Sequence, residues 1–128
     1  MNSVDAFASS LSDAELNALG LRLDGGMSLH SLLRTWERCA RVVSSGPIMV
    51  QEYINCLDIR NAIERDIELL TGDLAFKVSS LVVILDDVFR AATVDDGGLD
   101  VAQYTEVDKE RGAHWWWTRK PAQQLRGW

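Results

Sequence analysis

The sequence predicts an all-α protein, an antiparallel bundle of about four main helices followed by an irregular C-terminal wrap. Apolar residues recur at three- and four-residue spacing through most of residues 1–94. Capping residues and short Gly, Ser and Pro turns separate these stretches, as in bundles whose neighbouring helices run in opposite directions. The chain of 128 residues, 47% of them hydrophobic, is the size of one domain. We divide it into a helical core, residues 1–94, and an acidic loop with a Trp-rich tail, residues 95–128.

The first predicted helix begins after Ser12. Ser12 and Glu15 have the spacing of a capping box, in which each side chain accepts a hydrogen bond from the backbone N–H of the other residue. The apolar stripe of this helix consists of Leu16, Leu19 and Leu23. Gly25 and Gly26 end it.

The second predicted helix begins after Ser28, another residue type that favours the N-cap position. Its apolar face consists of Leu29, Leu32, Leu33, Trp36, Ala40 and Val43. Arg34, Arg38 and Arg41 recur on another face. We expect these arginines to pair with acids of neighbouring helices, and the alternative is a local basic strip.

The third predicted helix runs from about Pro47 to Leu70, with Arg60 and Asn61 interrupting its apolar stripes. These two residues lie either at the edge of the core or in a buried polar contact. Residues 71–73 turn the chain into a fourth helix. Its apolar residues are Leu74, Val78, Leu81, Val82, Ile84, Leu85, Val88, Phe89 and Ala92, so we expect it to be the most buried helix.

Beyond Thr93 the helical pattern stops. Residues 95–98, Asp-Asp-Gly-Gly, predict a turn rather than a calcium loop, and residues 101–107 alternate weakly enough to be extended. Three tryptophans follow at 115–117. In an extended segment Trp115 and Trp117 would share one face and Trp116 the other. Such rings either clamp the tail over the bundle or present an exposed anchor to a partner.

Composition and spacing argue against several classes of protein. The longest aliphatic run, residues 81–85, is far too short to span a bilayer, and the first ten residues do not resemble a secretory leader. We therefore expect a cytoplasmic protein that does not engage a membrane, with Cys39 and Cys56 as reduced thiols. Phosphate binding requires a basic surface, so the net charge of −6 argues against nucleic acid as the partner.

No motif predicts a metal site, a cofactor or an enzyme. The residues that bind zinc in other proteins occur here as His30, Cys39, Cys56 and His114, without the short spacings that place ligands on one turn. Neither histidine follows a glutamate by three residues, as di-metal bundles require. Phosphate-binding loops and nucleophile elbows are not recognisable either.

Charge is concentrated in the C-terminal third. Residues 95–110 contain six acids and one lysine, a net charge of −5, whereas residues 111–128 carry +4. Either these acids fold back onto the basic end, or they form a patch that attracts a basic partner. Glu64 and Glu68, one helical turn apart, are further candidates. The full set of candidate partner-binding residues is Glu64, Glu68, Asp95, Asp96, Asp100, Glu106, Asp108, Glu110 and Trp116.

Two C-terminal segments carry a resemblance to a known group of proteins. Residues 86–93 form an Asp-x-x-Phe-x-x-x-Thr helix end, and residues 115–121 form a Trp-rich tail that ends in Arg-Lys-Pro. Together they resemble small helical bacterial immunity proteins, which are encoded beside secreted polymorphic or contact-dependent toxins. The resemblance implies a protein that neutralises a cognate toxin, but it identifies no binding residue.

These observations predict an immunity protein that binds a basic-surfaced toxin, such as a nuclease, and occludes its active or substrate-binding surface. One alternative is a small helical adaptor or subunit of another complex. A second is an enzyme or ligand-binding bundle with a polar pocket near Arg60 and Asn61. The oligomeric state is left open between monomer and homodimer.

Overall fold

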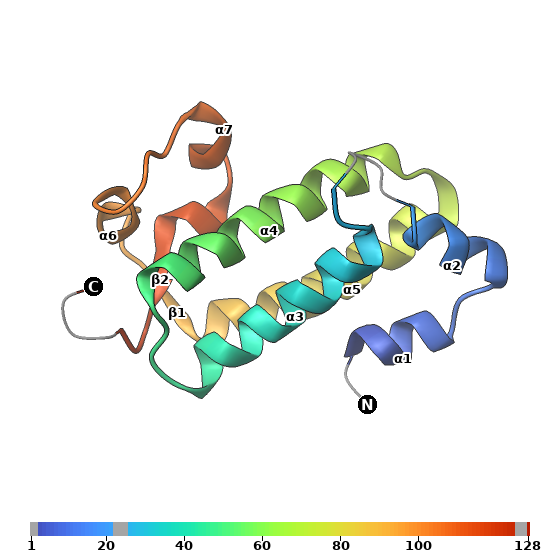
Figure 1. The fold of residues 1–128 in the computed structure, drawn as a ribbon, viewed down its shortest axis with the longest axis horizontal. Coiled ribbons are helices and arrows are strands. Elements are labelled where there is room, and N and C mark those ends of the chain that lie inside the picture. Colours follow the sequence, from blue (N-terminus) through green and yellow to red (C-terminus); the bar gives the residue numbers. More distant parts are fainter. Residues whose placement is uncertain (1–2, 22–25, 125–127) are drawn as a thin grey trace.

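The computed structural model describes residues 3–21, 26–124 and 128, and most of them are helical. Three long helices form the body of the molecule: α3 (Leu29–Ser45), α4 (Val50–Leu69) and α5 (Gly72–Ala91). They run in alternating directions, so the bundle is antiparallel (Figure 1). Among the described residues, no fourth long helix joins this arrangement. The segment predicted to form it is the short α2 (Asp13–Leu19), which follows a further short helix, α1 (Ser3–Ser9).

Helix capping follows the sequence closely. The capping box of α2 is confirmed, since the Glu15 N–H donates to Ser12 Oγ and the Ser12 N–H donates to Glu15 Oε1. Ser28 caps α3 as predicted, accepting from the backbone N–H of Ser31 at 3.2 Å. The predicted stripe residue Leu23 and the predicted terminator Gly25 lie outside the described residues.

The predicted apolar face of α3 is confirmed. All six of its residues are buried: Leu29, Leu32, Leu33, Trp36, Ala40 and Val43. The prediction that the last long helix is the most buried is wrong. Ile84 and Val88 are 56% and 40% exposed, and only the face with Leu81, Leu85 and Phe89 points into the core. Phe76, Val83, Ile84 and Val88, on the side of α5 away from the core, remain exposed.

The C-terminal wrap contains a small antiparallel sheet. Strand β1 (Thr93–Asp95) pairs with β2 (Arg119–Pro121), and between them lie α6 (Leu99–Ala102), α7 (Lys109–Gly112) and the 3-10 helix η1 (Trp115–Thr118). The predicted turn at residues 95–98 is confirmed. The extended reading of residues 101–107 is wrong, because Gly98 adopts a left-handed backbone and starts the turn of α6 that buries Val101.

The prediction of two reduced thiols is also wrong. Cys39 on α3 and Cys56 on α4 form a disulfide, with their Cα atoms 5.9 Å apart. Both cysteines lie on the buried faces by which these helices contact each other, which brings them within the usual range for a disulfide. Within the part of the chain that the structure describes, no helix is both long enough and apolar enough to cross a membrane.

Candidate functional site

The predicted acidic segment divides into two groups. Asp95, Asp96 and Asp100 belong to the β1–α6 turn. The side chains of Asp95 and Asp96 accept from the backbone N–H groups of Gly97 and Gly98 at 2.9 and 2.8 Å, so they hold the turn itself. Asp100 lies 3.5 Å from Lys120 and accepts from Gln124 at 2.9 Å. Asp100 therefore folds back onto the basic C-terminal segment, residues 111–128, which is the first of the two alternatives given for these acids.

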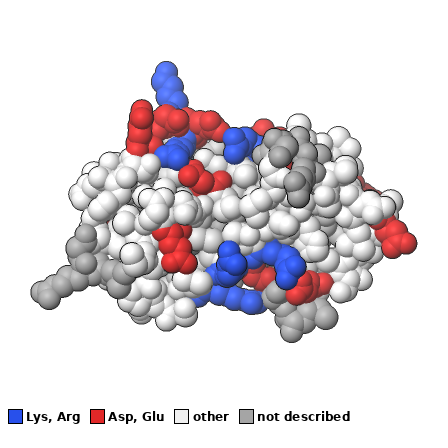
Figure 2. Space-filling model, in the orientation of Figure 1, with Lys and Arg blue, Asp and Glu red and all other residues white. Residues whose placement is uncertain are grey.

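The second group lies against α4 and faces solvent. Glu106, Asp108 and Glu110 are exposed, and Glu110 reaches Arg65 of α4 at 3.9 Å. On α4, Glu64 lies beside Arg65, and Glu68 is exposed one turn further along. We call this surface the acidic edge and define it by Asp58, Glu64, Glu68, Glu106, Asp108 and Glu110. Figure 2 shows acidic side chains gathered at the margin of the molecule where α7 lies.

Arg111 holds the acidic edge together. Its guanidinium donates to both carboxylate oxygens of Asp58 at 3.1 Å, to Thr105 Oγ1 at 2.9 Å and to the Glu106 carbonyl at 2.7 Å. The same group lies over the Trp117 ring, 4.6 Å from its centroid. Asp108 caps α7 by accepting from the Arg111 N–H. These contacts fix α7 against α4.

Trp116, one of the candidate partner-binding residues, is buried, so of the two alternatives for the tryptophans its ring takes the clamp and not the exposed anchor. Trp116 and Trp117 are 2% and 1% exposed, because η1 turns both rings inward where an extended chain would have separated them. Both indole N–H groups donate to one acceptor, Asn61 Oδ1, at 2.7 and 2.9 Å. The tail therefore clamps onto α4, and Asn61 is its anchor.

Arg60 forms a buried polar contact, which settles the choice left open by the sequence. Its guanidinium donates to both carboxylate oxygens of Asp86 at 3.0 Å and to Glu64 at 2.9 Å. Asp86 also accepts from the Trp36 indole at 3.1 Å, and Arg60 lies over the Trp116 ring. A buried charge needs hydrogen-bonding partners of this kind, so the stability of the fold explains this cluster of charged side chains. The same contacts occupy the polar groups of Arg60 that were expected to line a polar pocket.

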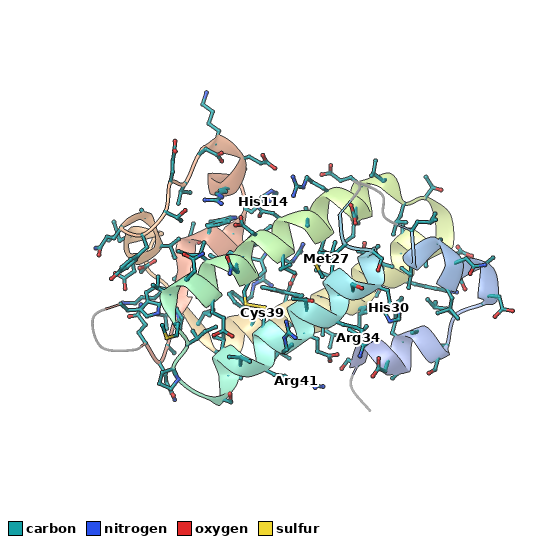
Figure 3. The ribbon with its side chains drawn as sticks, viewed as in Figure 1. Met27, His30, Arg34, Cys39, Arg41 and His114 are labelled. Carbon is teal, nitrogen blue, oxygen red and sulfur yellow. A yellow bond between two sulfur atoms is a disulfide. The ribbon has the colours of Figure 1, made fainter. Side chains whose placement is uncertain are left out.

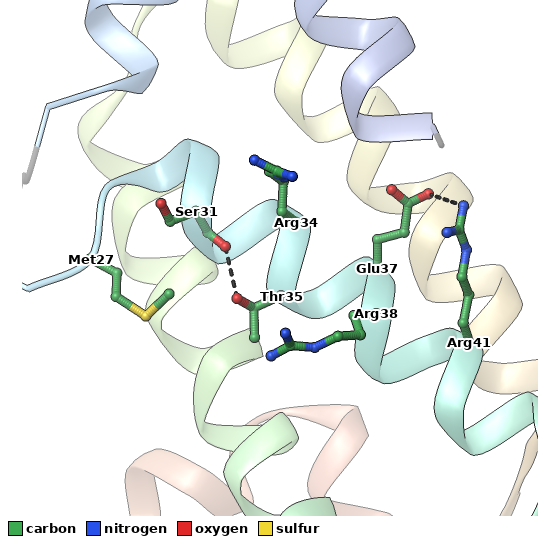
Figure 4. A pocket seen from close by; sticks show the side chains of 7 residues that line it. All are labelled: Met27, Ser31, Arg34, Thr35, Glu37, Arg38 and Arg41. Carbon is green, nitrogen blue, oxygen red and sulfur yellow. Dashed lines mark hydrogen bonds and ion pairs between the residues drawn. The ribbon is translucent and has the colours of Figure 1, made fainter. Parts of the chain in front are cut away.

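A shallow cleft of about 500 Å³ opens along the exposed face of α3 (Figure 4). Its lining residues are Met27, Ser31, Arg34, Thr35, Glu37, Arg38 and Arg41. Arg34 pairs with an acid of a neighbouring helix as predicted, Asp5 of α1 at 3.9 Å, whereas Arg41 pairs with Glu37 of its own helix at 3.4 Å. Both arginine side chains are more than half exposed, so the cleft is an open charged surface rather than an enclosed binding pocket.

Glu37 is a buried residue that our sequence reading missed. It accepts from the backbone N–H groups of Ser3 and Val4 at 2.9 and 3.1 Å, and so holds the start of α1 against α3. A signal was present, because residue 37 lies between Leu33 and Ala40 on the predicted apolar face.

The potential metal ligands are not brought together. Cys39 and Cys56 are bonded to each other, and His30 and His114 lie far apart on the molecule (Figure 3). Among the described residues, no group of three or more His, Cys, Asp or Glu side chains could hold a metal ion.

Comparison of the chain with protein families, with curated proteins and with solved structures finds no match. The function must therefore be argued from the residues themselves.

Proposed function

We propose that this chain is an immunity protein that binds a basic-surfaced bacterial toxin, such as a nuclease, and covers its active or substrate-binding surface. The observation that carries the proposal is the acidic edge. It has six acids against Arg60, Arg65, Lys109 and Arg111, and four of its acids are exposed. A toxin that binds a polyanion needs a basic surface, and an ordered acidic surface is complementary to it.

Preorganisation supports this reading. Binding a partner with mobile side chains costs roughly 0.5–1.5 kcal/mol for each one that must be ordered. Arg111 and the Asp108 cap already fix α7 in place. The carboxylates of Glu106 and Glu110 therefore project from a rigid support, which favours fast and specific association.

The two alternatives are weaker. An enzyme or ligand-binding site near Arg60 and Asn61 would need polar atoms available to a substrate, but these side chains already bond to Asp86, Glu64, Trp116 and Trp117. An adaptor or subunit of another complex would use the same acidic edge. The identity of its partner separates an adaptor from an immunity protein.

The proposal places the protein in the compartment where it meets the toxin, which we take to be the cytoplasm. A disulfide is typical of oxidising compartments. Trapping free thiols in intact cells and measuring whether Cys39 and Cys56 are alkylated therefore tests this location directly. A disulfide that persists fully in cells would move the site of neutralisation out of the cytoplasm.

The experiment is co-expression with the toxin candidate encoded by the neighbouring gene. We compare the wild type with a four-site variant of the acidic edge, Glu68→Gln, Glu106→Gln, Asp108→Asn and Glu110→Gln, in which asparagine preserves the cap of α7. The matched control removes four exposed acids elsewhere, Asp13→Asn, Glu52→Gln, Asp73→Asn and Asp87→Asn. Wild type and control should protect cells and the edge variant should not. Equal protection by all three would contradict the proposal.

A further inference from the structure

The disulfide that joins α3 to α4 borders a hollow in the surface of the bundle (Figure 3). The hollow has a volume of about 230 Å³, and both cysteines contribute to its lining. The other lining residues come from the same two helices: Thr35, Arg38 and Val42 from α3, and Glu52, Asn55 and Ile59 from α4. We call this space the disulfide hollow.

The disulfide hollow gives small molecules access to the bond. Exchange of a disulfide begins when a thiolate attacks one of its two sulfur atoms, so the reaction requires such access. Cys39 and Cys56 are 6% and 4% exposed, whereas Trp36 and Leu57 of the same two helices are 0% exposed. The hollow has room for several water molecules, which occupy about 30 Å³ each in the liquid. A thiol of a few heavy atoms therefore fits, and a folded protein reductase is too large to enter.

Two side chains of opposite charge line the disulfide hollow. Arg38 is exposed, and among the described residues no acidic side chain lies within ion-pair distance of it. Glu52 lines the hollow from α4. The attacking species is the negatively charged thiolate rather than the thiol. Arg38 therefore attracts the attacking species and Glu52 repels it.

We propose that the Cys39–Cys56 disulfide is a thiol-exchange site, reduced by low-molecular-weight thiols that enter the disulfide hollow while the protein remains folded. The chain has only these two cysteines, so both reducing thiols come from outside it. The first thiolate forms a mixed disulfide with one cysteine, and the other cysteine leaves with the electron pair of the broken bond and takes a proton from water.

A second thiolate completes the exchange. It attacks the sulfur of the bound small thiol, forms a free small-molecule disulfide with it, and releases the second cysteine as a thiolate, which is protonated in turn. The protein disulfide is thereby reduced by two electrons, and two small thiols are oxidised to one disulfide. The reverse sequence, with the small-molecule disulfide as oxidant, restores the bond.

The fold has contacts that survive reduction. Leu33 of α3 and Leu57 of α4 are 0% exposed, and Arg60 of α4 binds both carboxylate oxygens of Asp86 on α5. None of these contacts involves the sulfur atoms. The bond therefore responds to the balance of thiols and disulfides in its surroundings without unfolding of the bundle. This inference does not rest on the proposed function, because exchange is measured without any partner.

The test is the rate at which β-mercaptoethanol, a small neutral thiol, reduces the folded full chain, with free cysteines counted by alkylation. Asn55→Trp fills the disulfide hollow and should slow reduction about tenfold or more. The matched control is Gln51→Trp, at an exposed position of the same helix outside the hollow. Both variants lose the Gln51–Asn55 hydrogen bond, so only the filling of the hollow distinguishes them. The control should be reduced like the wild type.

Urea distinguishes entry through the hollow from reduction of the unfolded chain. Reduction through global unfolding would accelerate about fivefold or more per molar urea, because unfolding is that sensitive to denaturant. Reduction of the folded wild type should change by less than about twofold in ~1 M urea. A wild-type rate with the sensitivity of global unfolding would overturn the proposal, and so would reduction of Asn55→Trp at the wild-type rate.

Single-charge variants keep the test decisive if tryptophan at position 55 disturbs the fold, which circular dichroism reveals. At ~0.05 M NaCl, Arg38→Gln should be reduced about threefold more slowly than Glu52→Gln. Arg65→Gln, which removes the same charge elsewhere on α4, should be reduced like the wild type. Equal rates for Arg38→Gln and Glu52→Gln would overturn the disulfide hollow as the route of attack.

Discussion

Replacing Asn61 with leucine should detach the Trp tail from α4. Leucine has nearly the same shape as asparagine but offers no acceptor, so the indole N–H groups of Trp116 and Trp117 lose their common partner. Both rings are at most 2% exposed, and water does not reach them in the folded state. Each buried unsatisfied donor costs about 1–3 kcal/mol, so we expect the free energy of unfolding to fall by about 2–5 kcal/mol. That is a large part of the ~5–15 kcal/mol typical of a domain.

The assay is urea denaturation followed by tryptophan fluorescence and by circular dichroism. Four of the five tryptophans lie in residues 115–128 and one, Trp36, lies on α3, so fluorescence reports mainly on the tail and circular dichroism on the helices. An earlier fluorescence transition would show that the tail detaches before the bundle unfolds. The matched control is Asn55→Leu, on an exposed position of the same helix. It should change stability by no more than about 0.5 kcal/mol. A loss below about 1 kcal/mol for Asn61→Leu would refute the role of Asn61 as anchor.

Two further predictions concern the disulfide and Tyr53. The Cys39–Cys56 bond closes a loop with a sequence separation of 17, so replacing both residues with alanine should cost about 3 kcal/mol, measured by denaturation with and without reductant. A wild type that is insensitive to reductant would show that the bond is absent. Burial raises the pKa of the Tyr53 hydroxyl, which donates to the Arg119 carbonyl. Because the unfolded chain releases this proton above about pH 10 and the folded chain retains it, stability should fall above that pH. Tyr53→Phe should remove this part of the alkaline decline, and an unchanged pH profile would contradict it.

The local structure of this protein was more predictable than its tertiary arrangement. Ser12, Ser28 and the apolar face of α3 act within one helix, where spacing alone determines which atoms meet. The pattern around Ile84 and Val88 is equally helical, but whether a face is covered depends on how many helices surround it. The first predicted helix proved too short to take the fourth place in the bundle. The spacing of apolar residues in the sequence does not show how many helices will surround a given face.

For the candidate site, only the acidic composition of its residues was predictable from the sequence. The sequence showed six acids at residues 95–110, but Asp95 and Asp96 bind backbone N–H groups while Glu106 and Glu110 face solvent. That division follows from the left-handed glycines at 97 and 98 and from the contact of Arg111 with Asp58. The contact of Arg111 with Asp58 joins residues that are 53 positions apart in the sequence. The sequence left the environment of Trp116 open for the same reason, since its partner Asn61 lies on a helix distant in the sequence.

The association rate constant with the neighbouring-gene toxin tests the central claim most directly. Stopped-flow measurements should compare the four-site edge variant with the four-site control at ~0.05 and ~0.5 M NaCl, because oppositely charged surfaces mainly accelerate encounter and salt screens them. At low salt, we expect the edge variant to associate about tenfold more slowly than the wild type, and the control to match the wild type. The difference should largely disappear at high salt. Equal rates for edge variant and control at low salt would contradict recognition through the acidic edge.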